Sequence, residues 1–209
     1  MIKPFDNITL KNKEKLLKIV RSYTVNYGEN KKIMELFKDD DEFGIIVKGY
    51  IQIRKITNNG NIINIDELEE DSLISSSLFY TKNDEYEIIT KEPTQLLIFS
   101  YSEVINLDST DRYYVQFIKN LFKIINAKII ERNERIEIIS KKNIREKLLE
   151  YFNINSRKSG SRYIYLPFNF SDLANYLAVD RSAMSRELGY LKEEGFIEVK
   201  GKRISLLYR

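Results

Sequence analysis

Apolar and polar residues follow two rhythms along this chain, one typical of strands in its first half and one typical of helices after it. From Phe43 to Ile56 (FGIIVKGYIQIRKI), β-branched and aromatic residues end in an apolar–polar alternation, which predicts β structure. Asn58-Asn59-Gly60-Asn61 is a turn signal, and Ile62 to Ile65 is a further apolar run. Later candidate strands are Tyr86 to Thr90 and Gln95 to Phe99. Short strands separated by turns predict an antiparallel barrel or roll.

Helical periodicity predicts an amphipathic helix at Lys11 to Tyr23 and a long helix from Ser109 to Ser140 that contains no Gly or Pro. The long helix carries a seam with alternating four- and three-residue steps, as in a coiled coil. The seam comprises Ile118, Phe122, Ile125, Ile129, Arg132, Ile136 and Ile139. We therefore predict a homodimer, with packing of this stripe onto the chain's own strands as the alternative. Arg132 is unusual in a seam and would mark its register or a wetter stretch of interface.

The segment after Lys141 starts with a predicted helix at Ile144 to Phe152, followed by a polar loop at Asn153 to Arg162. Tyr163 to Leu166 is a predicted short strand that ends at Pro167. Ser171 is the predicted N-cap of the next helix. The inward-facing residues of that helix are Leu173, Ala174 and Leu177.

A second helix follows at once, with Asp180 as its predicted N-cap and Val179 and Met184 at staple spacing. Its predicted buried stripe is Met184, Leu188 and Leu191, and its exposed face carries Ser182, Ser185, Arg186 and Gly189. Gly195 ends the helix, and Phe196 to Val199 leads through Lys200-Gly201-Lys202-Arg203 into Ile204 to Leu207. The pattern predicts a helix-turn-helix followed by a wing.

The composition of the chain excludes several kinds of functional site. The chain has no cysteine and no histidine, which excludes disulfides, thiolate metal sites and cysteine-held iron–sulfur clusters and removes the usual proton shuttle. No Gly-rich phosphate loop is present, so we expect a protein that is not an enzyme and has no metal site. No apolar stretch reaches membrane-spanning length and the start lacks a signal-peptide block, so we expect a cytoplasmic protein without membrane contact.

Charge is distributed unevenly. Residues 141–209 contain 14 Lys and Arg against 8 Asp and Glu, a net charge of +6, whereas the whole chain has +3, which leaves −3 for residues 1–140. A basic carboxy-terminal third favours polyanion binding by that part of the chain. The candidate base-reading residues are Arg181, Ser182, Ser185 and Arg186, because an arginine on such a helix can donate two hydrogen bonds to guanine. The candidate contacts to phosphates are Ser171, Lys200, Lys202 and Arg203.

These motifs resemble the Crp/Fnr family of bacterial transcription regulators. The resemblance is most specific over SDLANYLAVDRSAMSREL…EEGFI at Ser171 to Ile204, while Tyr27-Gly28-Glu29 resembles the entry to the family's β-roll and GIIVKGYIQI its central hairpin, with Gly49 in the turn. Arg181 and Arg186 match recognition-helix arginines, and Ser185 matches a position often filled by serine or glycine. Ser182 replaces a common glutamate, and Ala178 stands where glycine is frequent.

The resemblance implies an α+β fold in three parts. These are an antiparallel β-roll like a cyclic-nucleotide-binding jelly roll at residues 1–107, a dimerisation helix at 108–140 and a winged helix-turn-helix at 141–209. It also implies a homodimer that binds a palindromic promoter site and recruits or blocks RNA polymerase. The alternative is a ligand-binding module whose carboxy-terminal domain contacts protein.

The sensing half departs from the family. Ile74 and Ser75 stand at the Gly-Glu positions that contact the ribose of a cyclic nucleotide, and Asp84 and Glu85 stand at the Arg-Ser positions that hold its phosphate. Carboxylates repel a phosphate, so we expect no cyclic AMP binding, and the lack of cysteine and histidine argues against an iron–sulfur or haem cofactor. The residues of a possible effector pocket are Ser75, Phe79, Tyr80, Asp84, Tyr86 and Tyr113, with ordinary packing as the alternative for the aromatic ones.

Overall fold

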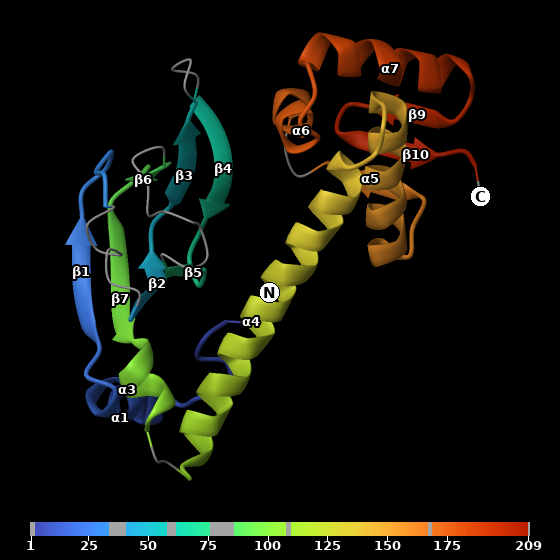
Figure 1. Ribbon diagram of the computed structural model, residues 1–209. Helices are drawn as coiled ribbons and strands as arrows, with labels where there is room; N and C mark the ends of the chain where they lie inside the picture. Colours follow the sequence, from blue (N-terminus) through green and yellow to red (C-terminus); the bar gives the residue numbers. More distant parts are fainter. Residues whose placement is uncertain are drawn as a thin grey trace. The chain divides into compact units, whose positions relative to one another are not determined.

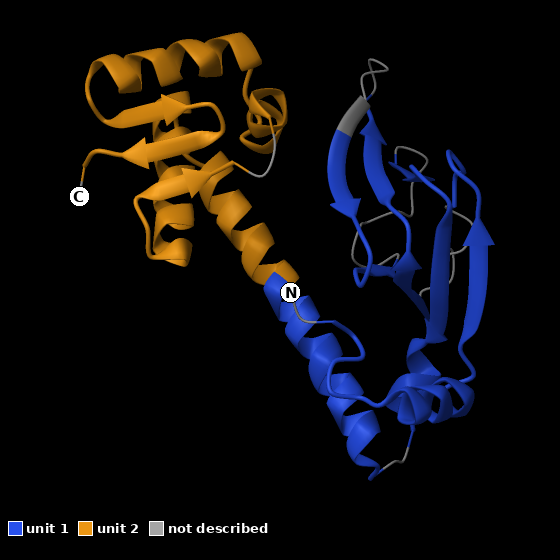
Figure 2. Ribbon diagram, turned by 180° about the vertical axis from the view of Figure 1, so that it is seen from behind, with its two compact units in different colours: residues 1–127 blue, residues 128–209 orange. Residues whose placement is uncertain are grey.

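The computed structural model describes residues 3–33, 41–57, 62–75, 86–107, 110–166 and 169–208. It divides the chain into two compact units, unit 1 (residues 1–127) and unit 2 (residues 128–209), which Figure 2 shows in different colours. The boundary falls inside the long helix α4, Arg112–Ile139, so this helix contributes to both units. None of the helices in the described ranges is long and apolar enough to cross a membrane.

Unit 1 begins with α1 (Leu10–Ile19) and continues into strands that form two antiparallel sheets (Figure 1). One sheet has the order β1-β7-β2-β5 and the other the order β4-β3-β6. The bounds are β1 Tyr23–Tyr27, β2 Glu42–Lys48, β3 Ile51–Ile56, β4 Ile62–Leu68, β5 Leu73–Ser75, β6 Tyr86–Thr90 and β7 Thr94–Ser100, after which α3 (Tyr101–Ile105) leads towards α4. The predicted antiparallel roll is thereby confirmed.

Two hydrophobic clusters stabilise unit 1. The first takes residues from both sheets and consists almost entirely of isoleucine: Ile33, Ile46, Ile51, Ile53, Leu68, Ile74, Ile88, Leu96 and Ile98. The second lies where α1, α3 and the start of α4 pack on the larger sheet. In it Phe99 lies between Phe43 and Phe117, with ring centroids 5.1 and 5.6 Å away. These rings fix the start of α4 against the roll.

Two predictions in unit 1 were wrong in detail. α1 ends at Ile19 rather than Tyr23, because Arg21 has a positive φ of 45° and Tyr23 pairs with Ile98 as the first residue of β1. The segment GIIVKGYIQI, Gly44 to Ile53, resembles a hairpin but is not one, since its strands β2 and β3 belong to different sheets. Gly49 joins them at φ 111°, and a Cβ there would lie 2.5 Å from Oγ1 of Thr94, so the crossing requires glycine.

The turn predicted at residues 58–61 lies outside the described residues; on either side of it, Ile56 pairs with Ile62, and β3 and β4 are antiparallel. The long helix was predicted over Ser109 to Ser140 and is observed as α4 at Arg112–Ile139.

Unit 2 consists of the end of α4, three further helices and a small sheet of order β8-β10-β9 (Figure 1). The bounds are α5 Ile144–Ser159, β8 Tyr163–Tyr165, α6 Phe170–Tyr176, α7 Arg181–Glu193, β9 Ile197–Lys200 and β10 Arg203–Leu206. Ile138 at the end of α4 packs in one core with Phe152, Leu173, Met184 and Ile204. The predicted winged helix-turn-helix is confirmed.

Two local predictions in unit 2 were also wrong. The segment from Asn153 is not a polar loop, because α5 continues to Ser159 and ends at Gly160, which adopts the left-handed conformation typical of a helix C-cap. Ile154 keeps the helix anchored, since it is buried in the core. Ser171 is not the N-cap of α6; Asn169 is, and its Oδ1 accepts the amides of Ser171 and Asp172 at 2.9 and 3.0 Å.

Candidate nucleic-acid interface

The turn between α6 and α7 sets the angle between the two helices. Leu177 is the C-cap of α6 and is fully buried, and the amide of Val179 donates to the carbonyl of Ala174 at 3.0 Å. Ala178 adopts a positive φ of 52° between them, a conformation that glycine takes at lower cost. Lys147 of α5 donates from Nζ to the carbonyl of Leu177 at 3.3 Å. These bonds hold the start of α7 in place relative to α6.

Asp180 caps α7, as predicted. Its Oδ1 accepts the Ala183 amide at 2.8 Å and the Ser182 hydroxyl at 2.5 Å. The Ser182 hydroxyl, and next the Ala183 amide, lower the pKa of the Asp180 carboxyl below its usual value. The hydroxyl hydrogen of Ser182 is therefore engaged within the chain, and this side chain is left with acceptor capacity towards a ligand.

The buried and exposed faces of α7 agree with the prediction. Met184, Leu188 and Leu191 are buried in the core of unit 2. Arg181, Ser182, Ser185 and Arg186 are exposed and Gly189 is half-buried. Among the residues that the structure describes, the guanidinium groups of Arg181 and Arg186 have neither a hydrogen bond nor an ion pair. Both are therefore available to an external acceptor.

An open hollow of about 330 Å³ lies beside α7, between this helix, the first residue of α6 and strand β9. Its lining residues are Phe170, Arg181, Met184, Ser185, Leu188, Gly189, Lys192 and Val199. Sequence reasoning identified the two residues Arg181 and Ser185 of this set as base-reading candidates but missed Lys192. The signal was present, because eleven residues separate Lys192 from Arg181, which is close to three helical turns and places both on one flank of the helix.

The three cations of the wing differ in their availability. Lys202 is exposed in the turn beside Gly201, whereas Lys200 pairs with Glu198 at 2.8 Å. Arg203 is half-buried; its guanidinium lies 5.7 Å from the Tyr163 ring centroid, and its Nε is buried without a hydrogen-bond partner. Ser171 is half-buried in the first turn of α6. Lys202 is thus the best placed of the four predicted phosphate contacts.

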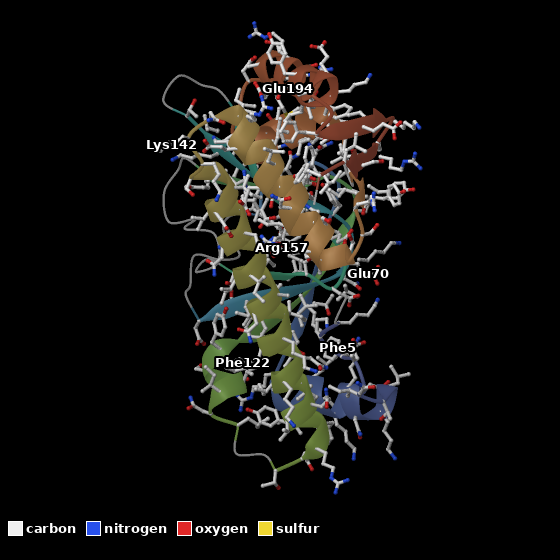
Figure 3. The ribbon with its side chains drawn as sticks, turned by 90° about the vertical axis from the view of Figure 1, so that its right-hand side faces the viewer. Phe5, Glu70, Phe122, Lys142, Arg157 and Glu194 are labelled. Atoms are coloured by element: carbon white, nitrogen blue, oxygen red, sulfur yellow. The ribbon has the colours of Figure 1, made fainter. Side chains whose placement is uncertain are left out.

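Acidic residues on the other flank of α7 are neutralised from α5. Arg145 pairs with Glu194, labelled in Figure 3, and with Glu187 at 3.5 Å, while its guanidinium lies 5.2 Å from the Phe196 ring centroid. The bond to Arg145 lowers the pKa of Glu194. This cluster anchors the end of α7 and offsets negative charge that would repel a polyanion.

The predicted seam of α4 is only partly covered. Phe122, labelled in Figure 3, is 65% exposed, Ile136 60% and Ile129 49%, whereas Ile118 and Ile125 are half-buried against the second cluster of unit 1. Arg132 is half-buried and has an interaction within the chain. Large apolar side chains at the surface of one copy are typical of a surface that another molecule covers.

Of the six residues predicted for an effector pocket, the structure describes Ser75, Tyr86 and Tyr113. Ser75 is buried at the end of β5, and Tyr113 packs against the second cluster of unit 1 and donates to Asp111 at 2.7 Å. Tyr86 begins β6, with Nζ of Lys55 5.4 Å from its ring centroid. Phe79, Tyr80 and Asp84, like Glu85, lie outside the described residues.

Comparison with known proteins points to one family. Residues 144–209 match the Crp-like helix-turn-helix domain. Electron transport regulator A of Shewanella oneidensis is 30% identical over 94 residues, which are 43% of this chain and 38% of that protein. The chain thus spans well under two thirds of the length of this curated relative.

Solved structures match over almost the whole chain. CprK in complex with OCPA is 19% identical with a TM-score of 0.67, covering 93% of this chain and 92% of that one. The catabolite activator protein of Thermus thermophilus is 17% identical with a TM-score of 0.52, covering 97% and 92%. At these identities the likeness shows the fold, and it confirms the predicted order of β-roll, long helix and winged helix-turn-helix.

Proposed function

We propose that the chain is a DNA-binding transcription regulator of the Crp/Fnr family, because residues 144–209 match the Crp-like helix-turn-helix domain and follow a β-roll and a long helix. In this proposal it binds a palindromic promoter site in the cytoplasm as a homodimer and thereby recruits or blocks RNA polymerase. The observation that carries the proposal is the exposed face of α7, on which the guanidinium groups of Arg181 and Arg186 make no hydrogen bond or ion pair in the described part of the chain.

Arg186 has the central role in reading the sequence. Guanine offers O6 and N7 as a pair of acceptors in the major groove, and a guanidinium can donate to both at once. Arg186 lies near the centre of the exposed face, while Arg181 stands in the first turn, where it reaches a base or a phosphate. Ser182 accepts a hydrogen bond from a base, since its own hydrogen is engaged by Asp180. Lys202 on the wing contacts a phosphate and adds affinity without selectivity.

In a homodimer, the two copies of the exposed face of α7 would bind the two halves of a palindromic site. The exposed side chains of Phe122, Ile129 and Ile136 on α4 would be covered by the same side chains of a second copy. A two-fold axis along the paired helices relates two recognition helices, which then enter major grooves about 34 Å apart.

We further propose that cyclic AMP does not control this regulator. Asp84 and Glu85 stand where the family has the phosphate-holding Arg-Ser pair, and the interior cluster of the roll, which includes Ile74, is apolar. A cyclic phosphate needs a cation or a hydrogen-bond donor at that point. Isothermal titration calorimetry with cyclic AMP tests this, and micromolar binding would overturn it.

The test of the function is selection of DNA by the whole protein. The full-length chain is incubated with a randomised pool of duplexes, and the enriched sequences are expected to contain two inverted half-sites. On the enriched duplex, Arg186→Ala should weaken binding by about 10- to 100-fold and relax selectivity at one base pair of each half-site.

The matched control is Arg157→Ala, which removes one exposed arginine of unit 2 from α5 (Figure 3) and should leave selectivity unchanged. Failure of the wild-type chain to enrich any sequence would contradict the function and favour a domain that contacts protein. Equal losses from Arg186→Ala and Arg157→Ala would contradict the base-reading role.

A further inference from the structure

Gly189 lies in the interior of α7 at a position where the helix itself does not require glycine. A glycine in a helix interior destabilises the fold by about 0.5–1 kcal/mol relative to alanine. Its φ is not positive, unlike that of Gly49, Gly160, Gly195 and Gly201. A Cβ built at Gly189 meets no heavy atom within 4 Å in the described part of the chain. The space in front of this glycine is therefore open to a molecule outside the chain.

The surroundings of Gly189 suit an anion. It lines the hollow beside α7, where the polar side chains are Arg181, Ser185 and Lys192 and where no lining residue is acidic. Lys192 is exposed and makes no hydrogen bond or ion pair among the described residues. Two carboxylates at the other flank of α7, Glu187 and Glu194, are engaged by Arg145, and Glu198 on β9 is paired with Lys200.

The spacing of the two cations that line the hollow, Arg181 and Lys192, suits an extended ligand. Eleven residues of helix separate them, which corresponds to about 16 Å along the axis of α7. One strand of duplex DNA carries a phosphate for about every 3.4 Å of helix axis, so a single strand can reach both cations several nucleotides apart. A small anion would occupy only one end of the hollow.

We propose that this hollow receives the sugar–phosphate backbone of one DNA strand, that position 189 is glycine so that the backbone can pass close to α7, and that Lys192 neutralises one of its phosphates. This inference rests on the proposed DNA-binding function and extends the contact surface to the carboxy-terminal half of α7. Because Gly189 has no side chain, it lets the DNA backbone approach α7 closely. It thereby affects the position of the helix in the groove and reads no base.

The test uses the full-length chain and the duplex enriched by the wild type. Gly189→Ala should raise the thermal unfolding midpoint by about 1–4 °C, because alanine favours the helix. The same variant should bind the duplex about tenfold more weakly, and Gly189→Leu more weakly still. A higher unfolding midpoint together with a weaker DNA affinity indicates that the glycine serves an external contact. If the glycine had only a structural role, the substitution would change the midpoint and the affinity in the same direction.

The control for added stability is Ser156→Ala, which replaces serine by the better helix former within α5 of the same unit. It should raise the midpoint and leave DNA binding unchanged. Lys192→Ala should lower the salt dependence of binding, reducing the slope of log K against log salt by about one per copy bound. Lys142→Ala, an exposed lysine before α5 (Figure 3), should leave the slope unchanged.

The outcomes separate the two proposals. If the wild type enriches no DNA, the function fails and this inference fails with it. If Arg186→Ala loses selectivity as expected but both Gly189 variants bind like the wild type, the backbone position is wrong while the function stands. A lower unfolding midpoint for Gly189→Ala would overturn the inference as well, because the fold itself would then require the glycine.

Discussion

Phe122 gives the sharpest test of the proposed homodimer. Its side chain lies on α4 in the predicted seam and is 65% exposed in a single copy (Figure 3). We expect Phe122→Ala to shift the chain from dimer to monomer, because it removes apolar surface that only the partner would cover.

The size of the effect follows from the exposed fraction. Full burial of a phenylalanine side chain stabilises by about 1.5–3 kcal/mol, so the 65% still exposed corresponds to about 1–2 kcal/mol per copy. A two-fold axis uses the position twice, which gives roughly 2–4 kcal/mol for the dimer. Since every 1.4 kcal/mol is a factor of ten, the dissociation constant should rise by about 30- to 700-fold.

Sedimentation equilibrium over a range of protein concentrations measures this constant. The matched control is Ile130→Ala on the same helix, because Ile130 is 56% exposed but lies one position outside the seam. It should leave the dimer unchanged. If Phe122→Ala does not change the constant, or if Ile130→Ala changes it equally, the paired-helix interface is wrong.

Two further predictions concern the start of the helix-turn-helix. Hydrogen bonds from Ser182 and Ala183 hold the pKa of Asp180 below its ordinary 3.8, so its ionised form stabilises the fold above about pH 4 and that contribution is lost as the pH falls through the lowered pKa. Urea unfolding should accordingly find wild type more stable than Asp180→Asn at neutral pH and the difference shrinking in acid; a difference independent of pH would refute this assignment. Ala178→Gly should raise the unfolding midpoint slightly, because the left-handed conformation costs alanine about 1–2 kcal/mol and the greater chain entropy of glycine offsets only part of that gain. A clear loss of stability in a thermal scan would show that the φ of 52° is not a strain.

Much of the fold could be predicted from periodicity because the long elements bury one regular face. α4 agrees with its predicted range to within three residues, α7 agrees with its predicted faces, and β6 agrees residue by residue. The errors occur where a local signal competes with packing. Asn153 to Ser159 is polar enough for a loop, yet Ile154 holds it in α5 and Gly160 ends the helix.

The path of the chain between the two sheets was harder to predict. Gly49 looked like the turn of a hairpin, and only the pairing of β2 with β5 and β7, and of β3 with β4 and β6, reveals a crossing between sheets. Pairing partners far apart in sequence leave no local trace in the residues at the turn.

The candidate site was predicted where it depends on one helix and missed where it depends on several elements. Arg181, Ser182, Ser185 and Arg186 follow from the periodicity of α7 alone. The hollow does not, because Phe170 and Val199 come from α6 and β9. Likewise, the stacking of Arg203 on Tyr163 of β8 could not be foreseen, and it reduces the availability of a wing cation.

The division of α4 between the two units has a consequence for how unit 2 can be isolated. Ile138 belongs to the buried core of unit 2, Arg135 donates from Nε to the carbonyl of Tyr176 at 3.3 Å, and Glu134 pairs with Lys158. A fragment that starts at residue 141 would leave a hole where Ile138 packs and would free one end of α6. Excision of the winged domain for crystallisation or NMR should therefore start near Lys128, so that the last turns of α4 remain attached as part of the folded body.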